Sequence, residues 1–354
     1  MKITRPFLMQ LLIVLLLLAL LSTACGSRSA KPGLTILDWA GYELSEYRAE
    51  FAEKHPDVEV KFTFFADDAE GYAKSRSGFK ADLVHPCTNY WGLYVEEGLV
   101  QPIDTSRLKY WSGIYEQLAE RGQFNGQQYF IPWDWGYESI LVRTDLIDTV
   151  PESWADLWNP EYAGYLSVYD AGQNIYEFTA LSMGLDPWNT TPEQIEQVKQ
   201  RILELKPNIF HYWSDYTELN QLVANGDIRV AASAWNDAYL VMLEEGIPVE
   251  YVNPTEGRMA WVCGYGISSN IENLDLAYDY LNALMAPEAN GAMANDFAYG
   301  PGNRNALQFM DDELIDLLEL DDPAVLEAAI LPRPLTAAQH QLYTDLWIEI
   351  KAAP

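Results

Sequence analysis

The chain is poor in basic residues and in the motifs that usually carry catalysis. Its 354 residues include 22 Lys and Arg against 52 Asp and Glu, and the formal net charge is −30. Such a surface repels nucleic acids and anionic membranes and favours the approach of cations. The four histidines show no HExxH spacing, and the sequence contains no GxSxG motif and no P-loop. We therefore expect no nucleic-acid partner, no metal, no cofactor and no enzymatic activity.

Long apolar runs are absent beyond the N-terminus. There, Lys2 and Arg5 precede the apolar run from Leu11 to Leu21, and the small residues of "LSTACG" lead into Cys25. This order is typical of a secretory signal peptide, here residues 1–24, and the place of the cysteine resembles a bacterial lipobox. We expect a lipid on Cys25, a tether over residues 25–33 and a body outside the cytoplasm. The alternative is an ordinary signal peptide followed by an incidental cysteine.

Cysteine is nearly absent from the body of the protein. Besides Cys25, only Cys87 and Cys263 occur. An oxidising compartment favours one disulfide between them. Two separately buried thiols are the alternative.

The body alternates segments with strand and helix periodicity. "LTILDWA" and "DVEVKFTFF" are typical of strands, and "SEYRAEFAEKH" between them predicts an amphipathic helix with Tyr47, Phe51 and Ala52 on its apolar face. "TPEQIEQVKQRILELKP" predicts a helix capped by Thr191 and ended by Pro207. Such alternation favours an α/β fold, and a body of roughly 320 residues suits two domains.

One aromatic stretch frames a carboxylate. In "IPWDWGYES", Asp134 lies between Trp133 and Trp135. The stretch is either part of the core, with the acid as a turn or cap residue, or a box for a cation. Aromatic faces attract ammonium groups, and a carboxylate supplies the countercharge.

Six stretches of the body are distinctive enough to compare with known families. They are "LTILDWAGY", "ADLVHPCTNYW", "FIPWDWGYESILVRTDLI", "ESWADLWNPEYAG", "AASAWNDAYLVMLEEGIPVEYVNP" and "AWVCGYGISS". In order and spacing they resemble the spermidine/putrescine-binding proteins of bacterial ABC importers, and the likeness covers roughly residues 34 to 350.

The resemblance implies an α/β type II periplasmic-binding fold, with two lobes around a ligand cleft. Lobe 1 is expected over residues 34–135 and 262–306, and lobe 2 over residues 136–261 and 307–354. Strands should cross between the lobes near Trp135 and Val262. The resemblance also implies a monomer that delivers its solute to ABC permease subunits.

The aromatic part of the family's binding site is retained. In that family, aromatic side chains of both lobes enclose the methylene chain of the ligand, and carboxylates bind its ammonium groups. The matching aromatic residues are Trp39, Tyr42, Trp235, Trp261 and Tyr299. Cys87 and Asn89 also fall on positions that line the cleft.

The acidic part of that site is retained poorly. Cys263 stands where the family has a ligand-binding Asp, and a bridge to Cys87 would explain this loss. An ungapped match keeps Asp170 but places Asn174 where an acid is expected, whereas a one-residue shift would retain the acid. Arg333 replaces a ligand-contacting Gln.

Two other acids offer replacements. Asp134 lies between its tryptophans near the first crossing, and Asp237 follows Trp235 by two residues. We therefore favour amine recognition at the stretch that contains Trp133, Asp134 and Trp135.

The leading hypothesis is a lipid-anchored binding protein that captures a polyamine-like amine for an ABC importer. An alternative is a binding protein for a zwitterion, such as 4-aminobutyrate, another amino acid or a betaine. Its carboxylate would pair with Arg333. An extracytoplasmic enzyme or an adhesive lipoprotein is a third class.

Overall fold

The computed structural model describes residues 33–353. The expected signal peptide, Cys25 and the tether up to residue 32 lie outside the described residues. Within residues 33–353, no helix has the length and apolar character needed to cross a membrane.

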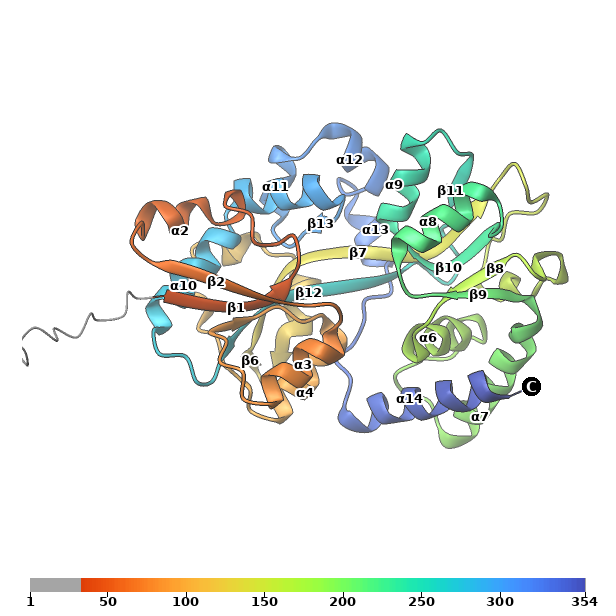
Figure 1. Cartoon of the computed structure of the whole chain (residues 1–354), viewed down its shortest axis with the longest axis horizontal. Coiled ribbons are helices and arrows are strands. Elements are labelled where there is room, and N and C mark those ends of the chain that lie inside the picture. The colour runs from red at the N-terminus through yellow and green to blue at the C-terminus, as the bar shows by residue number, and fades with distance from the viewer. Residues whose placement is uncertain (1–32, 354) are drawn as a thin grey trace, which may run out of the picture.

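A mixed β-sheet runs through the whole molecule (Figure 1). Its main path has the order β2-β1-β3-β12-β7-β10-β8-β9, while β11 and β13 pair with β7 and β4 pairs with β12. A separate two-stranded sheet joins β5 and β6. The strands are β1 (Gly33–Trp39), β2 (Glu59–Phe65), β3 (Leu83–Val84), β4 (Val100–Gln101), β5 (Gln123–Phe124), β6 (Gln127–Gln128), β7 (Phe130–Arg143), β8 (Leu166–Tyr169), β9 (Ile209–Trp213), β10 (Val230–Trp235), β11 (Val249–Tyr251), β12 (Met259–Ser268) and β13 (Gly300–Pro301).

Helices cover the two halves of this sheet (Figure 1). The α-helices are α2 (Ala49–Lys54), α3 (Asp68–Arg76), α4 (Thr88–Glu96), α5 (Glu116–Ala119), α6 (Gly172–Ser182), α7 (Pro192–Leu205), α8 (Tyr216–Asn225), α9 (Asn236–Glu244), α10 (Leu274–Leu284), α11 (Pro287–Phe297), α12 (Asp312–Leu318), α13 (Pro323–Ala328) and α14 (Ala337–Ala352). The short 3₁₀ helices are η1 (Glu46–Arg48), η2 (Thr105–Arg107), η3 (Trp111–Gly113), η4 (Glu120–Gly122), η5 (Trp154–Trp158), η6 (Pro160–Tyr162), η7 (Lys206–Asn208) and η8 (Arg304–Phe309).

Two long strands join the halves. β7 and β12 run from the half that contains β1, β2 and β3, here called lobe 1, into the half that contains β8, β9 and β10, here called lobe 2 (Figure 1). They are antiparallel, and Val262 pairs with Trp135, the two positions near which crossings were expected. All 14 residues of β7 are buried, which fits a strand with neighbours on both edges.

The chain returns to lobe 2 later than Ala306, the limit expected from sequence. η8 still packs against α11 of lobe 1, where the backbone at Ala306 and the side chain of Phe309 leave room only for the glycine at Gly291. The first contacts with the lobe 2 end of β12 follow, as an ion pair from Arg258 to Glu319 and a bridge from Met259 to Ile330. α14 then packs against α6 and α7.

Local sequence signals account for several elements. Thr191 forms a capping box at the start of α7, and Pro192 occupies its first turn, as predicted. The segment after β1 folds as η1 followed by α2, and it buries Tyr47 and Phe51. Ala52 is exposed, so its expected place on the apolar face is wrong, because the 3₁₀ turn rotates the face that α2 presents.

Candidate functional site

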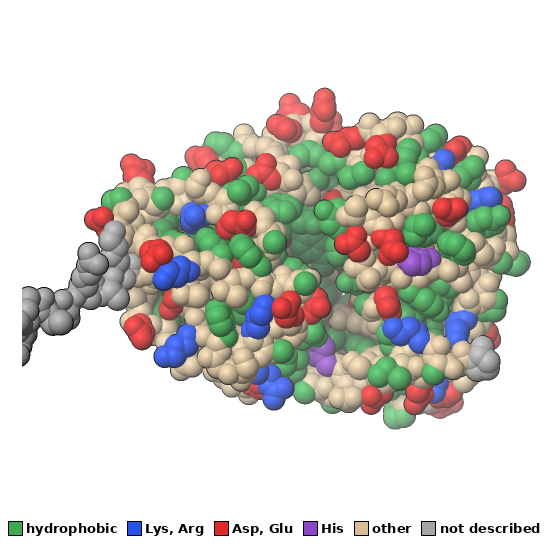
Figure 2. All heavy atoms as spheres, viewed as in Figure 1, with side chains coloured by type: hydrophobic (Ala, Val, Ile, Leu, Met, Phe, Trp, Pro, Cys, Tyr) green, Lys and Arg blue, Asp and Glu red, His purple; other side chains and the backbone are tan. Residues whose placement is uncertain are grey.

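A hollow lies between the two lobes (Figure 2). Apolar side chains line its depth, and acidic side chains stand at its rim on both sides. Interlobe hollows of α/β proteins are frequent ligand sites, because loops after several strands converge there. The long strands β7 and β12, which join the two lobes, carry several of the expected site residues.

The register of β7 and β12 decides which of their residues share a face of the sheet. Residues that pair directly across antiparallel strands point to the same side of the sheet. Trp261 pairs with Gly136, Cys263 pairs with Asp134, and Met259 pairs with Glu138. Asp134, Gly136 and Glu138 therefore share the face that carries Trp261 and Cys263. The indoles that flank Asp134 belong to the alternate positions of the strand.

An aromatic wall continues from Trp261 into lobe 1. The rings of Trp261 and Tyr299 meet edge to face at 4.6 Å, and Tyr299 stacks on Phe297 at 5.6 Å. Phe297 in turn stacks on Tyr42 at 4.5 Å. Gly136 makes the first contact feasible, because a Cβ there would lie 2.6 Å from the Trp261 ring.

Lobe 2 contributes a second aromatic group. Trp235, at the end of β10, contacts Tyr169 at 5.6 Å and Trp213 at 5.4 Å between ring centroids. Trp235 and Tyr169 are only partly buried. On lobe 1, Trp39 is also partly buried, and its indole nitrogen donates to the backbone oxygen of His85 at 2.9 Å.

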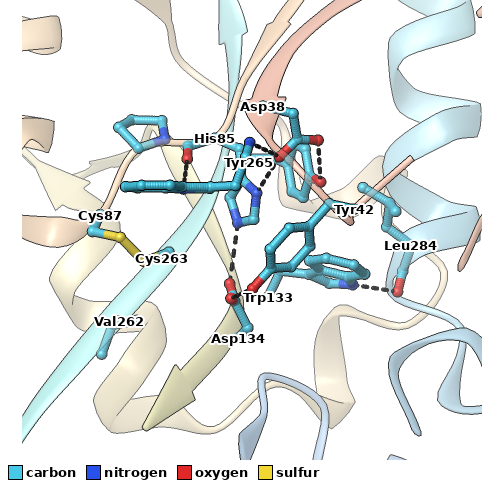
Figure 3. A network of polar contacts seen from close by, with 12 residues as sticks. Asp38, Tyr42, His85, Cys87, Trp133, Asp134, Val262, Cys263, Tyr265 and Leu284 are labelled. Atoms are coloured by element: carbon cyan, nitrogen blue, oxygen red, sulfur yellow. Dashed lines mark hydrogen bonds and ion pairs between the residues drawn. A yellow bond between two sulfur atoms is a disulfide. The ribbon is translucent and has the colours of Figure 1, made fainter. Parts of the chain in front are cut away.

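Lobe 1 contains a buried polar network of Asp38, Tyr42, His85, Asp134 and Tyr265 (Figure 3). The Nδ1 atom of His85 lies 2.7 Å from a carboxylate oxygen of Asp38, and its Nε2 atom lies 3.1 Å from one of Asp134. Tyr42 donates to Asp134 at 2.6 Å, and Tyr265 donates to Asp38 at 2.8 Å. Burial alone would lower the pKa of His85, but the charges of the two carboxylates and the hydrogen bonds to them raise it to about 9. His85 is therefore an imidazolium at neutral pH.

This network corrects the cation-box interpretation of the stretch around Asp134. Trp133 is 1% exposed and Trp135 is 2% exposed, and their indole nitrogens donate to the backbone oxygens of Leu284 and Pro301. Asp134 itself is 2% exposed. The cation that Asp134 binds is the protein's own His85. Trp133 also packs against the rings of Tyr42, His85 and Tyr265, so it is a core residue of this network.

Cys87 and Cys263 form a disulfide, so the alternative of two separate thiols is wrong. The bond joins β12 to the residue that precedes α4. The backbone N–H of Cys87 also donates to Asp68 at 2.9 Å. The disulfide thus fixes one wall of the hollow beside a carboxylate.

Three carboxylates near the aromatic groups have no basic partner among residues 33–353. Burial raises the pKa of Asp68 to about 7, and it raises that of Asp237 to about 6. Burial, followed by the charge of Glu177, raises the pKa of Glu138 to about 8. A raised pKa of this kind means that each ionised carboxylate lacks a compensating charge.

The remaining expected site residues have protein partners. Asn174 donates its side-chain amide to Glu138. Asp170 accepts from Trp347 at 2.7 Å and from Lys351 at 2.8 Å. The backbone oxygen of Asn89 lies 2.8 Å from the ring nitrogen of His340.

Arg333 is exposed. Its guanidinium lies 3.5 Å from a carboxylate oxygen of Asp186 and 5.2 Å from the ring centroid of Trp188. Arg333 thus forms an exposed ion pair with an acid of lobe 2. This geometry weakens the expectation that Arg333 offers a partner for a ligand carboxylate.

Sequence reasoning missed several residues of this region. Asp68, Glu138 and Tyr169 were not singled out, and neither were Asp38 and His85 of the buried network. Glu138 had a detectable signal, because it follows Asp134 by four residues and an extended strand places both on one face. Asp68 had none, because one more acid among 52 does not stand out. In the described part of the chain, no three His, Cys, Asp or Glu residues are grouped so that they could hold a metal ion.

Comparison with known proteins supplies the context for this geometry. The sequence matches the family of bacterial extracellular solute-binding proteins over residues 46–321. The spermidine/putrescine-binding periplasmic protein of Escherichia coli strain K12 is 28% identical over 284 residues, which cover 79% of this chain and 80% of that protein. The putrescine-binding periplasmic protein PotF of the same strain is 25% identical over 358 residues, which cover 94% of this chain and 95% of that protein.

A similar fold occurs in solved structures. The spermidine/putrescine ABC transporter substrate-binding protein PotD from Streptococcus pneumoniae superposes with a TM-score of 0.78 at 23% sequence identity. The alignment covers 90% of this chain and 98% of that protein. The likeness shows that the two chains share a two-lobed fold.

Proposed function

Because the chain belongs to the bacterial extracellular solute-binding proteins, we propose that it captures a polyamine-like amine between its lobes and delivers it to an ABC permease. Relatives named for spermidine and putrescine binding support the substrate class. The proposal concerns binding and transport, and it includes no catalytic step.

One feature of the cleft carries the proposal. Aromatic side chains of both lobes, among them Trp39, Trp235 and Trp261, lie near carboxylates that have no basic partner in the described chain. Aromatic faces suit both the methylene chain and the ammonium groups of an amine, and unpaired acids supply the countercharge. An ammonium moved from water into such a cleft needs a carboxylate, because its lost solvation costs several kcal/mol.

We assign the ligand contacts to the cleft-facing residues. From the expected set these are Trp39, Trp235, Asp237, Trp261 and Tyr299, with Cys87 and Cys263 as the wall that the disulfide forms. Tyr42 supports this surface from the buried network, where it donates to Asp134. Asn174 acts through Glu138, to which it donates. Trp133, Asp134 and Trp135 support this surface from the core.

The zwitterion alternative has less support in the geometry. It required a basic side chain for the ligand's carboxylate, and Arg333 was the candidate. That guanidinium is paired with Asp186. The acids near the aromatic groups would repel the carboxylate of a zwitterionic ligand.

A panel of ligands tests the function on the lipid-free body. Putrescine, cadaverine and spermidine should raise its unfolding temperature, and 4-aminobutyrate and glycine betaine should not. A ligand at 100 times its dissociation constant stabilises the fold by about 2.7 kcal/mol, which such a scan detects. Stabilisation by 4-aminobutyrate or betaine alone would overturn the proposal.

We also propose that the protein lies outside the cytoplasm as a monomer anchored by a lipid on Cys25. The lipobox-like "LSTAC" and the periplasmic relatives support this location. Replacement of Cys25 by Ser should move the protein from the membrane fraction to the soluble fraction without a change in amine affinity. A variant that stays membrane-bound after high-salt washing would contradict the anchor.

A further inference from the structure

Asn236 is a buried side chain at the junction of β10 and α9. It is the first residue of α9, it directly follows Trp235, and only 1% of it is exposed. The register of β10 with β7 shifts between Ala231 and Ala234, just before this junction. Ser233, within the shift, has a φ of 56°, which is uncommon for a residue other than glycine. Strained backbone of this kind persists where the surrounding structure requires it, and it clusters at functional sites.

The side chain of Asn236 joins the two lobes. Its amide nitrogen donates to the backbone oxygen of Ala298, which belongs to lobe 1. Its amide oxygen accepts the backbone N–H of Tyr137, on the interlobe strand β7, at 3.0 Å. Both polar ends of this buried amide are therefore satisfied by backbone groups outside α9. A movement of the lobes that separates α9 from Ala298 would have to break the first of these bonds.

Three of the expected aromatic residues meet around Asn236. Trp235 precedes it in sequence, and Tyr299 directly follows the residue whose backbone oxygen it bonds. Trp261 lies beside it over Gly136, where an added Cβ would be 2.5 Å from the amide oxygen of Asn236 and 2.6 Å from the Trp261 ring. The rings of Trp261 and Tyr299 are in contact at 4.6 Å. The amide of Asn236 thus lies where aromatic groups of the two lobes come together.

The partner of Asn236 in lobe 1 lies at the turn that leads into Tyr299. Ala298 ends α11 in the left-handed conformation, with a φ of 53°. Such a conformation is costly for alanine and needs support from its surroundings. The hydrogen bond from Asn236 to the oxygen of Ala298 holds the peptide group that joins Ala298 to Tyr299. It therefore acts on the direction in which Tyr299 leaves the helix.

We infer that Asn236 is a positioning residue for solute binding, whose amide holds Trp235 of lobe 2 in register with Tyr299 of lobe 1. Its own polar atoms are occupied by backbone groups, so it acts through its neighbours rather than by contact with the solute. The inference rests on the proposed amine-binding function and adds to it a residue that fixes the relative placement of the aromatic groups. Because a bound solute and this hydrogen bond favour the same arrangement of the lobes, loss of the bond should speed release of the solute more than it slows capture.

A matched pair of alanine variants tests this role. Asn290 is the control, because it is fully buried and its amide also donates to a backbone oxygen, that of Trp133, and accepts a backbone N–H, that of Asn303, all within lobe 1. Asn236→Ala and Asn290→Ala should both lower the free energy of unfolding, since each strands buried backbone groups. Only Asn236→Ala should weaken putrescine and spermidine binding, by roughly tenfold, and mainly through faster dissociation in stopped-flow tryptophan fluorescence. Equal losses of affinity in the two variants, or no loss in Asn236→Ala, would overturn the inference.

A leucine variant separates the hydrogen bonds from packing. Asn236→Leu fills a similar volume but can neither donate to Ala298 nor accept from Tyr137. It should therefore bind putrescine as weakly as Asn236→Ala does. Wild-type affinity in Asn236→Leu would overturn the inference, because the role of Asn236 would then be only to fill space.

Hydrogen exchange of the wild-type protein gives a test that does not depend on the folding of a variant. Putrescine should slow exchange of the Tyr137 N–H, whose acceptor is Asn236, because the solute holds α9 in place. The N–H of Asn303, whose acceptor is Asn290, is the internal control and should change little. Equal changes at the two amides, or no change at Tyr137, would overturn the inference.

The outcomes separate this inference from the proposed function. A wild-type protein that binds neither putrescine nor spermidine would overturn the proposed function. A wild-type protein that binds them no more tightly than the Asn236 variants do would overturn the role of Asn236 alone.

Discussion

His85 is a buried residue that carries a positive charge between two carboxylates. Its imidazolium lies between Asp38 and Asp134, all three side chains being buried. Because its pKa in the folded protein is about 9, above the unfolded value of about 6.5, folding favours the protonated form. This stabilisation is fully present below about pH 6.5 and is lost as the pH rises through 9.

We predict that the wild-type protein loses on the order of 3 kcal/mol of unfolding free energy from this group between pH 6.5 and pH 10. His85→Gln should be less stable at pH 6, because it strands two buried carboxylates, and should lack this part of the pH dependence. Urea unfolding at several pH values measures both effects. His211→Gln, at a half-buried histidine beside Glu218, is the control and should keep the wild-type slope. Parallel curves for wild type and His85→Gln would contradict the role of His85.

At the residue scale, the sequence predicted the aromatic side chains better than the charges. Trp39, Trp235, Trp261 and Tyr299 are partly buried, and their role as ligand contacts stays a prediction. Asp134 was assigned to a ligand because its tryptophans are adjacent in sequence. Adjacent residues of a strand point to opposite faces, so sequence neighbours are poor guides to spatial neighbours there. His85 was missed because a lone histidine carries no signal until its carboxylate partners, 47 and 49 positions away, are placed.

At the element scale, strong local sequence signals were sufficient to predict where elements begin. The pairing register of strands that are distant in sequence could not be predicted. The capping box and proline of α7 set its start, and the Cys87–Cys263 disulfide was expected from composition and compartment. The face that β7 presents to the cleft depends on its register with β12, which is shifted between Cys263 and Gly264. A shift of one residue exchanges the two faces of a strand, and no sequence motif shows where such a shift occurs.

At the scale of the whole molecule, the acidic composition and the two-lobed fold both fit the capture of a cationic solute. A net charge of −30 raises the local concentration of cations, and the hollow between the lobes is lined by hydrophobic side chains with acidic side chains at its rim (Figure 2). The family resemblance was sufficient to predict this architecture. The later return of the chain to lobe 2 was not predicted, because the packing of η8 on α11 depends on the close approach at Gly291 rather than on any sequence motif.

The acids of the cleft also predict that amine binding depends on pH. The pKa values of Asp237, Asp68 and Glu138 are raised to about 6, 7 and 8, and a cation binds their ionised forms. Because folding and burial favour protonation of these groups, a diamine must displace protons as it binds. Its affinity should therefore rise with pH through this range, while its own ammonium groups remain charged.

The most direct test is a calorimetric titration of the lipid-free wild-type protein with putrescine at pH 6 and pH 8. We predict saturable binding with one site, an affinity roughly tenfold or more higher at pH 8, and release of protons to the buffer. 4-Aminobutyrate should give no binding heat under the same conditions. Binding of 4-aminobutyrate without binding of putrescine or spermidine would contradict the account of this cleft as a site for amines with two or more positive charges.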